Sequence, residues 1–367
     1  MDASAVNPLG YDLFIGLDVD KKSYSLTVED RYNLEKSYKM PANPESFYKF
    51  IQNKYFSKKI LYVYEAGCTG YRLHDYLTEQ REQCFVISPN SIPRASNDKV
   101  KTNRIDSKKL CELLKGGLLK PIRVPQEEYR ELRHLVNIRK NYARKQKMAK
   151  QQIEGLLLFE NICLPMGERK RWSAYHIQLL KKIACSPATR IRLDALLMDL
   201  SYARSQMLSI HCEIRRFCSQ QPAIQKNIEY LRSIPGIGFV IATYVLSRIG
   251  DPRFLKNVRE IAAFAGIVPK ERSTGDTVRK GNITHMGDET FRYLLVEASW
   301  IAIRKDLELK QFYHRIKSRH PVKGGSQIAI VGVARKLTHR IYSVLKEQRM
   351  YMNHSCKTLK GKPEPRS

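Results

Sequence analysis

The sequence lacks several features that would place it in common classes of protein. No run of 18 apolar residues occurs, which argues against a membrane-spanning helix and a membrane partner. The eight cysteines include no Cys-x-x-Cys pair, so we expect free thiols, with Cys212 and Cys218 as small core residues, and no zinc ribbon. The first residues lack the basic-then-apolar order of a signal peptide, so we expect a cytoplasmic protein.

Acidic residues are also scarce. The chain has 36 Asp and Glu against 65 Lys and Arg, a formal charge of +29. Solubility does not require this excess, and the usual reason for it is a polyanionic partner, of which nucleic acid is the commonest. With 367 residues, 43% of them hydrophobic, the chain is long enough for two or three domains with cores of their own.

The first segment alternates strand and helix patterns and predicts a mixed α/β domain over residues 10–122. A helix is expected over Asp106–Gly117 with Asp106 as its N-cap, and another in "TGYRLHDYLTEQ". The second strand pattern alternates and follows the first closely enough to pair with it as a hairpin. The expected strands are Leu13–Val19, Ser23–Glu29, Lys59–Glu65 and Gln83–Ser88.

Three carboxylates follow these elements in a suggestive order. Asp18 lies inside an otherwise apolar strand, Glu65 ends another, and Asp106 opens a helix, which is the order of an RNase H-like nuclease. Such enzymes use two Mg²⁺ ions about 4 Å apart, held by carboxylates. Asp20 shares a face with Asp18 and is a nearby competitor. An actin-like ATPase is disfavoured because "DVDKKS" lacks the glycine of its phosphate loop, and no Walker pattern occurs.

Two long helices are expected over residues 123–225. The first begins after Pro125, and between Arg130 and Lys150 it carries eight Lys or Arg residues and one acidic residue. This imbalance favours contact with a nucleic-acid backbone over a merely solvated face. The residues proposed for this contact are Arg139, Lys140, Arg144 and Lys147.

The second long helix, about Arg190–Ser219, shows a heptad seam typical of a coiled coil. The seam could pack on the preceding helix of the same chain or serve self-association, and the pattern does not choose between them. Its apolar positions are Leu193, Leu196, Leu200, Ala203, Met207, Ile210, Ile214 and Phe217.

Residues 226–350 predict a mostly helical domain, with a final helix over Gly324–Arg349 and a basic, disordered tail over 351–367. The stretch "SIPGIGF" is similar to a helix-hairpin-helix element, in which Gly236 and Gly238 would let backbone amides approach a phosphate. A plain helix-loop-helix is the alternative.

A pair of hydroxyl residues, Ser273 and Thr274, precedes a glycine in the predicted loop "KERSTGDTVRKG". They form either an ordinary turn or a nucleophile aimed at a phosphate. The cations that flank the pair are Lys270, Arg272, Arg279 and Lys280.

Nearly the whole chain resembles a family of bacterial insertion-sequence transposases. The resemblance rests on "FIGLDVDKKSYSL", "YVYEAGCTGYRL" and "KVKTNRIDSKKL", and on the long block from "IPGIGFVIATYVL" to "YLLVEASW". That family joins an N-terminal RuvC-like DEDD domain of the RNase H fold to a C-terminal serine-bearing transposase domain. Its members are understood as recombinases guided by a non-coding bridge RNA.

The resemblance implies a metal site and a nucleophile. Asp18, Glu65, Asn103 and Asp106 match the four metal-binding positions, with Asn103 where the family usually has Asp; an amide offers an oxygen without charge. Asp98 could replace it only if its loop bends. Ser273 matches the catalytic serine, although Thr274 is adjacent.

The family also implies the partners. These are two Mg²⁺ ions, DNA at the element ends and target, a guide RNA, and a homodimer or homotetramer that acts at the bacterial nucleoid. Two alternatives remain open from the sequence: a metal-dependent junction endonuclease in which Ser273 is structural, and a nucleic-acid-binding relative that has lost catalysis.

Overall fold

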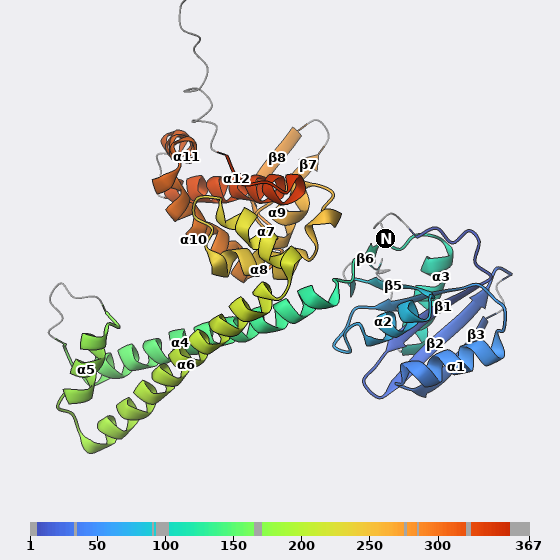
Figure 1. The fold of residues 1–367 in the computed structure, drawn as a ribbon, viewed down its shortest axis with the longest axis horizontal. Coiled ribbons are helices and arrows are strands. Elements are labelled where there is room, and N and C mark those ends of the chain that lie inside the picture. Colours follow the sequence, from blue (N-terminus) through green and yellow to red (C-terminus); the bar gives the residue numbers. More distant parts are fainter. Residues whose placement is uncertain are drawn as a thin grey trace, which may run out of the picture. The chain divides into compact units, whose positions relative to one another are not determined.

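The computed structural model describes residues 6–32, 35–89, 92, 103–164, 171–274, 277–284, 286–320 and 324–352. Its contacts divide the chain into two compact units, Met1–Val124 and Pro125–Ser367 (Figure 1). Within the described ranges, no helix is both long and apolar enough to cross a membrane. The described cysteines are free thiols, as expected, and Cys218 is buried. Cys212 is exposed, so its expected place in the core is wrong.

The first unit is built on a six-stranded mixed sheet in the order β3-β2-β1-β4-β5-β6. β1 pairs antiparallel with β2 and parallel with β4, and β5 extends the parallel part. This arrangement confirms the expected mixed α/β domain and is consistent with a RuvC-like fold. The strands are β1 (Leu13–Val19), β2 (Ser23–Asp30), β3 (Glu35–Pro41), β4 (Ile60–Glu65), β5 (Gln83–Ile87) and β6 (Pro121–Ile122).

Helices cover both faces of this sheet because β1 and β4 are apolar on both sides. One face packs on α1 (Pro44–Lys54) and α2 (Arg72–Glu79) through a core that contains Phe47 and Leu77. The other face packs on α3 (Asn103–Lys115), whose Leu110, Cys111 and Leu114 are fully buried against it. The position of α3 matters most for function, as the candidate site below lies beneath it.

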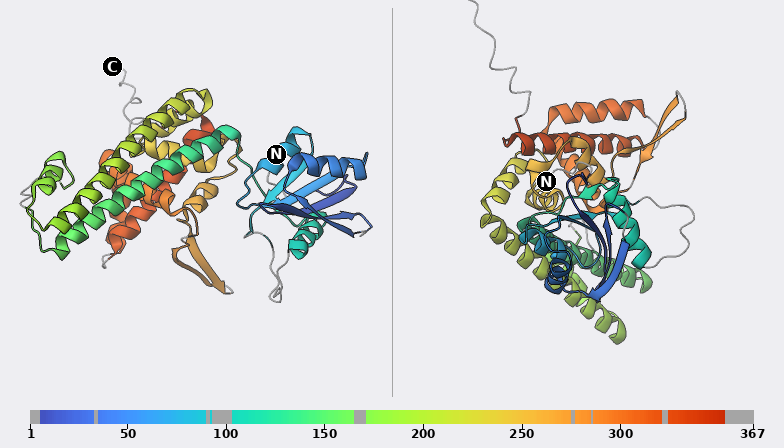
Figure 2. Two further views of the ribbon diagram at one scale, coloured as in Figure 1. Left: turned by 90° about the horizontal axis from the view of Figure 1, so that it is seen from below. Right: turned by 90° about the vertical axis from the view of Figure 1, so that its right-hand side faces the viewer.

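The second unit begins with a long helical hairpin, α4 (Glu127–Phe159) and α6 (Pro187–Ser219), with the short α5 (Ala174–Lys182) between them (Figures 1 and 2). α6 packs along α4 of the same chain through buried seam residues that include Leu193, Leu200 and Ile214. Its burial differs in detail, because Leu197 and Cys218 are buried where Leu196 and Phe217 are only partly so.

The remaining elements of this unit form a helical bundle with one small β-hairpin, around a single core that also includes the start of α4. The expected helix after "PGIG" and the expected final helix are both present. The elements are α7 (Pro222–Arg232), α8 (Phe239–Ile249), a short 3-10 helix (Pro252–Phe254), α9 (Val258–Ala265), β7 (Pro269–Thr274), β8 (Thr277–Ile283), α10 (Glu289–Lys305), α11 (Leu307–Arg319) and α12 (Gly325–Glu347). Residues 353–367 of the expected tail lie outside the described part of the chain.

Candidate active site

Two acidic positions end adjacent parallel strands of the sheet. The register of β1 and β4 pairs Leu17 with Tyr64, so the next positions along the strands are Asp18 and Glu65. A parallel sheet holds such neighbouring positions about 4.8 Å apart. Both residues are half-buried. The sheet therefore brings two of the predicted carboxylate positions side by side at the carboxyl ends of its strands.

Strand alternation puts both acids on the face that α3 covers. Phe14 lies four positions before Asp18 and belongs to the core beneath α3. Val63 lies two positions before Glu65 and belongs to the same core. Residues two apart in a strand share a face. Asp18 and Glu65 therefore lie on the α3 side of the sheet.

The close seating of α3 depends on Gly16 of β1. A Cβ atom at this position would lie 2.2 Å from the carbonyl oxygen of Ser107 and 2.6 Å from the amide nitrogen of Cys111. Only glycine allows the helix backbone to approach the strand this closely. The buried hydroxyl of Ser107 also lies 3.0 Å from that of Thr27 on β2, which fixes the first turns of α3 over the sheet.

Asp106 lies near the start of α3, but not as its helix cap. The helix begins at Asn103, three residues earlier than expected, and Asp106 lies in its first turn, half-buried beside Ser107. The prediction that Asp106 is the N-cap is therefore wrong. Positions three and four apart share a helix face, so position 103 falls on the same side as 106 and 107. The side chain of Asn103 and all of Asp98 lie outside the described residues.

The donors on this face suit a hard cation with few protein ligands. Mg²⁺ prefers oxygen ligands and is commonly held by one or two carboxylates together with water and substrate phosphate. Asp18 and Glu65 supply such a pair. Within the described ranges, no group of three His, Cys, Asp or Glu side chains is gathered to hold a metal ion.

The predicted nucleophile lies in a β-hairpin of the second unit. Ser273 belongs to strand β7 and pairs with Val278 of β8, so the expectation of a loop at this position is wrong. The hairpin extends away from the helices (Figure 2). The sequence suggests a loop here because the stretch is polar and contains Gly275 and Gly281. The residues between the strands, Gly275 and Asp276, lie outside the described part.

The hairpin register sorts the cationic positions around Ser273. Arg272 is paired with Arg279, and Glu271 is paired with Lys280. Adjacent positions of a strand alternate between two faces. Position 280 therefore shares a face with position 273, whereas 272 and 279 belong to the other face. Lys270 is exposed at the irregularity where the ladder begins.

The base of the hairpin is held by close backbone contacts. The amide of Thr284 donates to the carbonyl of Val268, at 2.8 Å, and the amide of Asp288 donates to the carbonyl of Phe264, at 2.7 Å. A Cβ at Gly287 would lie 2.6 Å from the amide nitrogen of Gly266, which ends α9 in the left-handed conformation. The two ends of the hairpin segment are thus fixed to the helical core and to each other.

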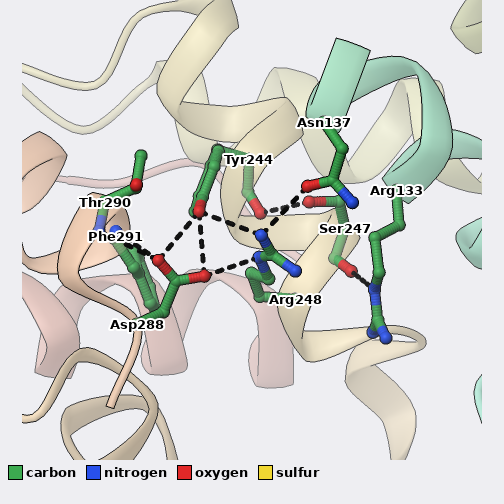
Figure 3. Close-up of polar contacts among 8 residues, drawn as sticks. All are labelled: Arg133, Asn137, Tyr244, Ser247, Arg248, Asp288, Thr290 and Phe291. Atoms are coloured by element: carbon green, nitrogen blue, oxygen red, sulfur yellow. Dashed lines mark hydrogen bonds and ion pairs between the residues drawn. The ribbon is translucent and has the colours of Figure 1, made fainter. Parts of the chain in front are cut away.

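Asp288 links this base to two helices (Figure 3). Its carboxylate caps α10 by accepting from the amides of Thr290 and Phe291, and it accepts two bonds from the hydroxyl of Tyr244, at 2.9 and 2.8 Å. The Nε of Arg248 lies 2.8 Å from its Oδ2. Arg248 in turn donates to Asn137 of α4, so the network joins α4, α8 and α10.

The network keeps Asp288 charged. Burial raises the pKa of its carboxyl, but the hydrogen bonds from Tyr244 and the Phe291 amide outweigh this effect. The positive charge of Arg248 acts in the same direction, and the pKa of Asp288 is held below its ordinary value. The sequence analysis missed this residue, although an Asp before "ETFRYLL" is a recognisable N-cap.

The two glycines of the "PGIG" turn have different environments. Gly236 has a φ of 93°, and a Cβ there would lie 2.3 Å from the carbonyl oxygen of Ala298 on α10. Its place is therefore set by packing on α10. Gly238 is exposed at the N-cap of α8, with no atom within 4 Å of a Cβ built there. Of the two, Gly238 leaves the amides of a helix N-terminus open to a phosphate.

The four basic residues predicted on α4 also separate into two groups. Lys140, Arg144 and Lys147 are exposed and follow the spacing of one helix face. Arg139 is half-buried, and its Nε atom is buried without a hydrogen-bond partner in the described structure. The first three form a solvent-facing basic stripe, while Arg139 lies toward the junction with α6 and α8.

Comparison with known proteins identifies the kind of enzyme. A model of the IS116/IS110/IS902 transposase family matches residues 228–314, and a model of the IS110 DEDD transposase domain matches residues 15–161. The chain is a transposase, similar to the IS110/IS116 family in both matched regions. The second match covers the sheet with Asp18 and Glu65 and continues through α4 of the second unit, whereas the first match lies within the second unit, on the bundle that carries the hairpin.

Curated relatives of the transposase include proteins that are themselves named transposases and one that is named for inverting a gene. A putative transposase of Sinorhizobium fredii is 29% identical over 296 residues, 79% of this chain and 71% of the relative. A probable family 20 transposase of Pseudomonas aeruginosa is 23% identical over 348 residues, 92% of this chain and 98% of the relative. The pilin gene-inverting protein of Moraxella bovis is 26% identical over 132 residues, 35% of this chain and 40% of that protein.

Proposed function

We propose that the transposase excises and inserts a mobile element by Mg²⁺-dependent strand cleavage and by exchange through a phosphoserine intermediate. A non-coding bridge RNA would select the element ends and the target by base pairing. The observation that supports the metal-dependent half is that neighbouring positions of β1 and β4 carry Asp18 and Glu65 on the sheet face that α3 covers.

The first unit would bind and orient the phosphodiester. When bound, Mg²⁺ would neutralise charge on the phosphate that undergoes cleavage. Asp18 and Glu65 would hold it from the strand ends, and Asp106 and Asn103 are the residues that α3 would contribute. Asn103 contributes no charge, so this set carries one negative charge fewer than four carboxylates would, and we expect weak metal affinity without nucleic acid.

The second unit would supply the covalent step. The Oγ of Ser273 would form a bond to phosphorus, the bond from phosphorus to one sugar oxygen would break, and that oxygen would leave as a hydroxyl after taking a proton. A hydroxyl of the new strand would then attack the phosphoserine and release Ser273. Lys280, whose position shares the hairpin face with Ser273, is the preferred cation for stabilising the phosphorane. Thr274 is the alternative nucleophile.

Partial likeness to a protein named for inverting a gene supports exchange over simple hydrolysis. Inversion of a DNA segment requires that cut strands be rejoined, which a covalent protein–DNA intermediate makes possible without an external energy source. The net charge of +29 and the exposed stripe of Lys140, Arg144 and Lys147 support contact with DNA and RNA backbones. Homodimers or homotetramers would bring sheet and hairpin of different subunits to one strand.

The test is a denaturing gel of the full chain with labelled element-junction DNA, Mg²⁺ and the transcript that flanks the gene. We expect a DNA-linked protein band with wild type and with Thr274→Ala, and none with Ser273→Ala or Asp18→Asn. Cleavage without any linked band, retained in Ser273→Ala but lost in Asp18→Asn, would instead identify a metal-dependent endonuclease. Nucleic-acid binding without cleavage in any reaction would identify a binding protein.

A further inference from the structure

Cationic and aromatic side chains meet where α4, α6 and α8 pack together. Arg139 comes from α4, His211 and Arg215 lie one turn apart on α6, and Phe239 is the first residue of α8. We call these four residues the junction cluster. The Nε of Arg215 donates to Nε2 of His211 at 3.0 Å, and the guanidinium of Arg215 lies 4.6 Å from the centroid of the Phe239 ring.

Phe239 fixes the geometry of the cluster. The ring of His211 meets it edge to face, with centroids 5.3 Å apart and planes at 83°. A guanidinium over an aromatic face is attracted by the quadrupole of the ring and keeps its N–H groups in a defined plane. The imidazole and the guanidinium are therefore held together in advance, rather than extended separately into solvent.

The positive charge of the cluster has no acidic partner in the described part of the chain. Neither Arg139 nor Arg215 forms an ion pair with a carboxylate there, and Nε of Arg139 is buried without a hydrogen bond. Glu213, which is close by on α6, is paired with Arg216. A half-buried cation without a partner is unfavourable for folding, which indicates a site that an external anion completes.

The pKa shifts of the half-buried Arg139 and His211 agree with this geometry. Burial lowers the pKa of Arg139. Burial also lowers the pKa of His211, and the positive charges of Arg215 and then Arg139 lower it further. From α4 the charge that acts on His211 is that of Arg139, from α6 it is that of Arg215, which contacts the imidazole, and α8 contributes the uncharged Phe239. An anion here would oppose the two cations and favour protonation.

The open helix terminus lies directly beside this cluster. Gly238 precedes Phe239 and is the exposed N-cap of α8, with no side chain that accepts from its first amides. Backbone amides at a helix N-terminus bind anions, and here they adjoin cations of two other helices. The combination offers both charge and directional N–H donors to one oxyanion.

We propose that the junction cluster binds a backbone phosphate of nucleic acid and that His211 takes up a proton as the phosphate binds. The inference rests on the proposed function only in taking nucleic acid as the substrate. Nε2 of His211 accepts a proton from solvent and becomes a donor. The Nε–H of Arg215, released from His211, then donates to a phosphate oxygen. Binding is coupled to proton uptake, so affinity rises as the pH falls toward the ordinary pKa of histidine.

The experiment measures the Kd of the full chain by fluorescence anisotropy, for labelled duplex DNA and for an RNA hairpin. We expect Arg139→Gln and Arg215→Gln each to weaken binding about five- to tenfold and to lower the slope of log K against log salt by about one. Arg216→Gln is the matched control, because it removes the same charge from the next residue of α6. It should change Kd by less than about twofold.

Proton uptake by His211 is tested separately, through the pH dependence of Kd. For wild type we expect Kd to tighten between pH 8 and pH 6, and His211→Gln should remove most of this dependence while Arg216→Gln retains it. Melting curves of each variant verify that the fold is intact. The proposal is overturned if Arg139→Gln and Arg215→Gln bind like Arg216→Gln, or if the pH dependence survives in His211→Gln.

Two further outcomes separate the sources of the anion and the two proposals. Saturable binding of inorganic phosphate at micromolar concentration, lost in Arg139→Gln, would assign the cluster to free phosphate and refute the nucleic-acid assignment. Wild type that binds neither DNA nor RNA would refute both this inference and the proposed function. Normal binding by wild type and by all cluster variants would refute this inference alone.

Discussion

The charge on Asp288 is predicted to stabilise the second unit, and Asp288→Asn tests it with little change in shape. Asparagine is as good an N-cap as aspartate, so the bonds from the amides of Thr290 and Phe291 can remain. What is lost is the ion pair with Arg248, at 2.8 Å, and the Oδ2 acceptor 2.8 Å from the Tyr244 hydroxyl, while an oxygen at the Oδ1 position remains. Hydrogen bonds to charged groups contribute about 1.5–3 kcal/mol each when well shielded.

The side chains of Asp288 and Arg248 are 22% and 21% exposed, so solvent reduces that value. We expect a loss of about 1–2 kcal/mol in the free energy of unfolding. With an m-value of about 2–3 kcal/mol per molar urea, the midpoint should fall by roughly 0.5 M. Both tryptophans, Trp172 and Trp300, belong to the second unit, so their fluorescence follows the unfolding of this unit alone.

The sharper test is how the difference in unfolding free energy between wild type and Asp288→Asn depends on pH. The pKa of Asp288 is lowered in the folded protein, so its stabilisation is fully present above the unfolded value of about 3.9 and is lost as pH falls through the lower folded value. Wild type and Asp288→Asn should therefore differ by a constant amount from pH 8 to pH 5 and converge only below about pH 4.

A surface ion pair is the control for this prediction. Asp194 pairs with Arg190 on α6 at 3.3 Å, but its side chain is 52% exposed, and Asp194→Asn should cost less than about 0.5 kcal/mol. The reasoning is refuted if Asp288→Asn is no more costly than Asp194→Asn, or if its deficit grows on acidification from pH 7 to pH 5.

The remaining predictions concern glycines and the hairpin. Gly16→Ala should displace α3 and abolish DNA cleavage, with a loss of about 3 kcal/mol in the stability of the first unit by circular dichroism, because its Cβ would meet helix backbone at 2.2 Å. Gly67→Ala, with no atom closer than 3.9 Å, should remain stable. Gly236→Ala should destabilise the second unit by at least about 2 kcal/mol in urea unfolding, since its φ is 93°. In strand-transfer assays, Lys280→Ala should be slower than Arg279→Ala; equal rates would contradict the assignment of faces.

Buried, periodic segments were predictable from the sequence. β1 and β4 are apolar runs, and their pattern predicted that Asp18 lies inside one strand and that Glu65 ends another; that the two strands are neighbours comes from the structure. The strand β3 was missed because "EKSYKMP" lies at the edge of the sheet, where charged residues replace an apolar pattern. The helix α1 was also missed, although Asn43 followed by Pro44 is a good helix start.

The errors in the candidate site have local causes. Asp106 had the appearance of a helix cap because its carboxylate precedes an apolar pattern, but α3 extends one turn further toward Asn103. The strand at Ser273 has no apolar alternation in its sequence, so composition did not indicate its pairing with β8. The packing of Gly236 on Ala298 is a tertiary contact over more than sixty residues, which no local pattern contains.

The base of the hairpin has a consequence for how relatives can diverge. Gly266 and Gly287 hold the two ends of the β7–β8 segment together. The packing of the core therefore does not depend on the length of the projecting hairpin. Insertions or deletions should therefore be tolerated here more readily than elsewhere in this unit. The number of residues added to or removed from each strand must be even, however, if the serine is to stay on the same face. Changing each strand by two residues preserves the face of the serine, whereas changing each by one turns it to the opposite side. Homologous ribbons that keep the same chemistry should consequently differ in length by even steps per strand.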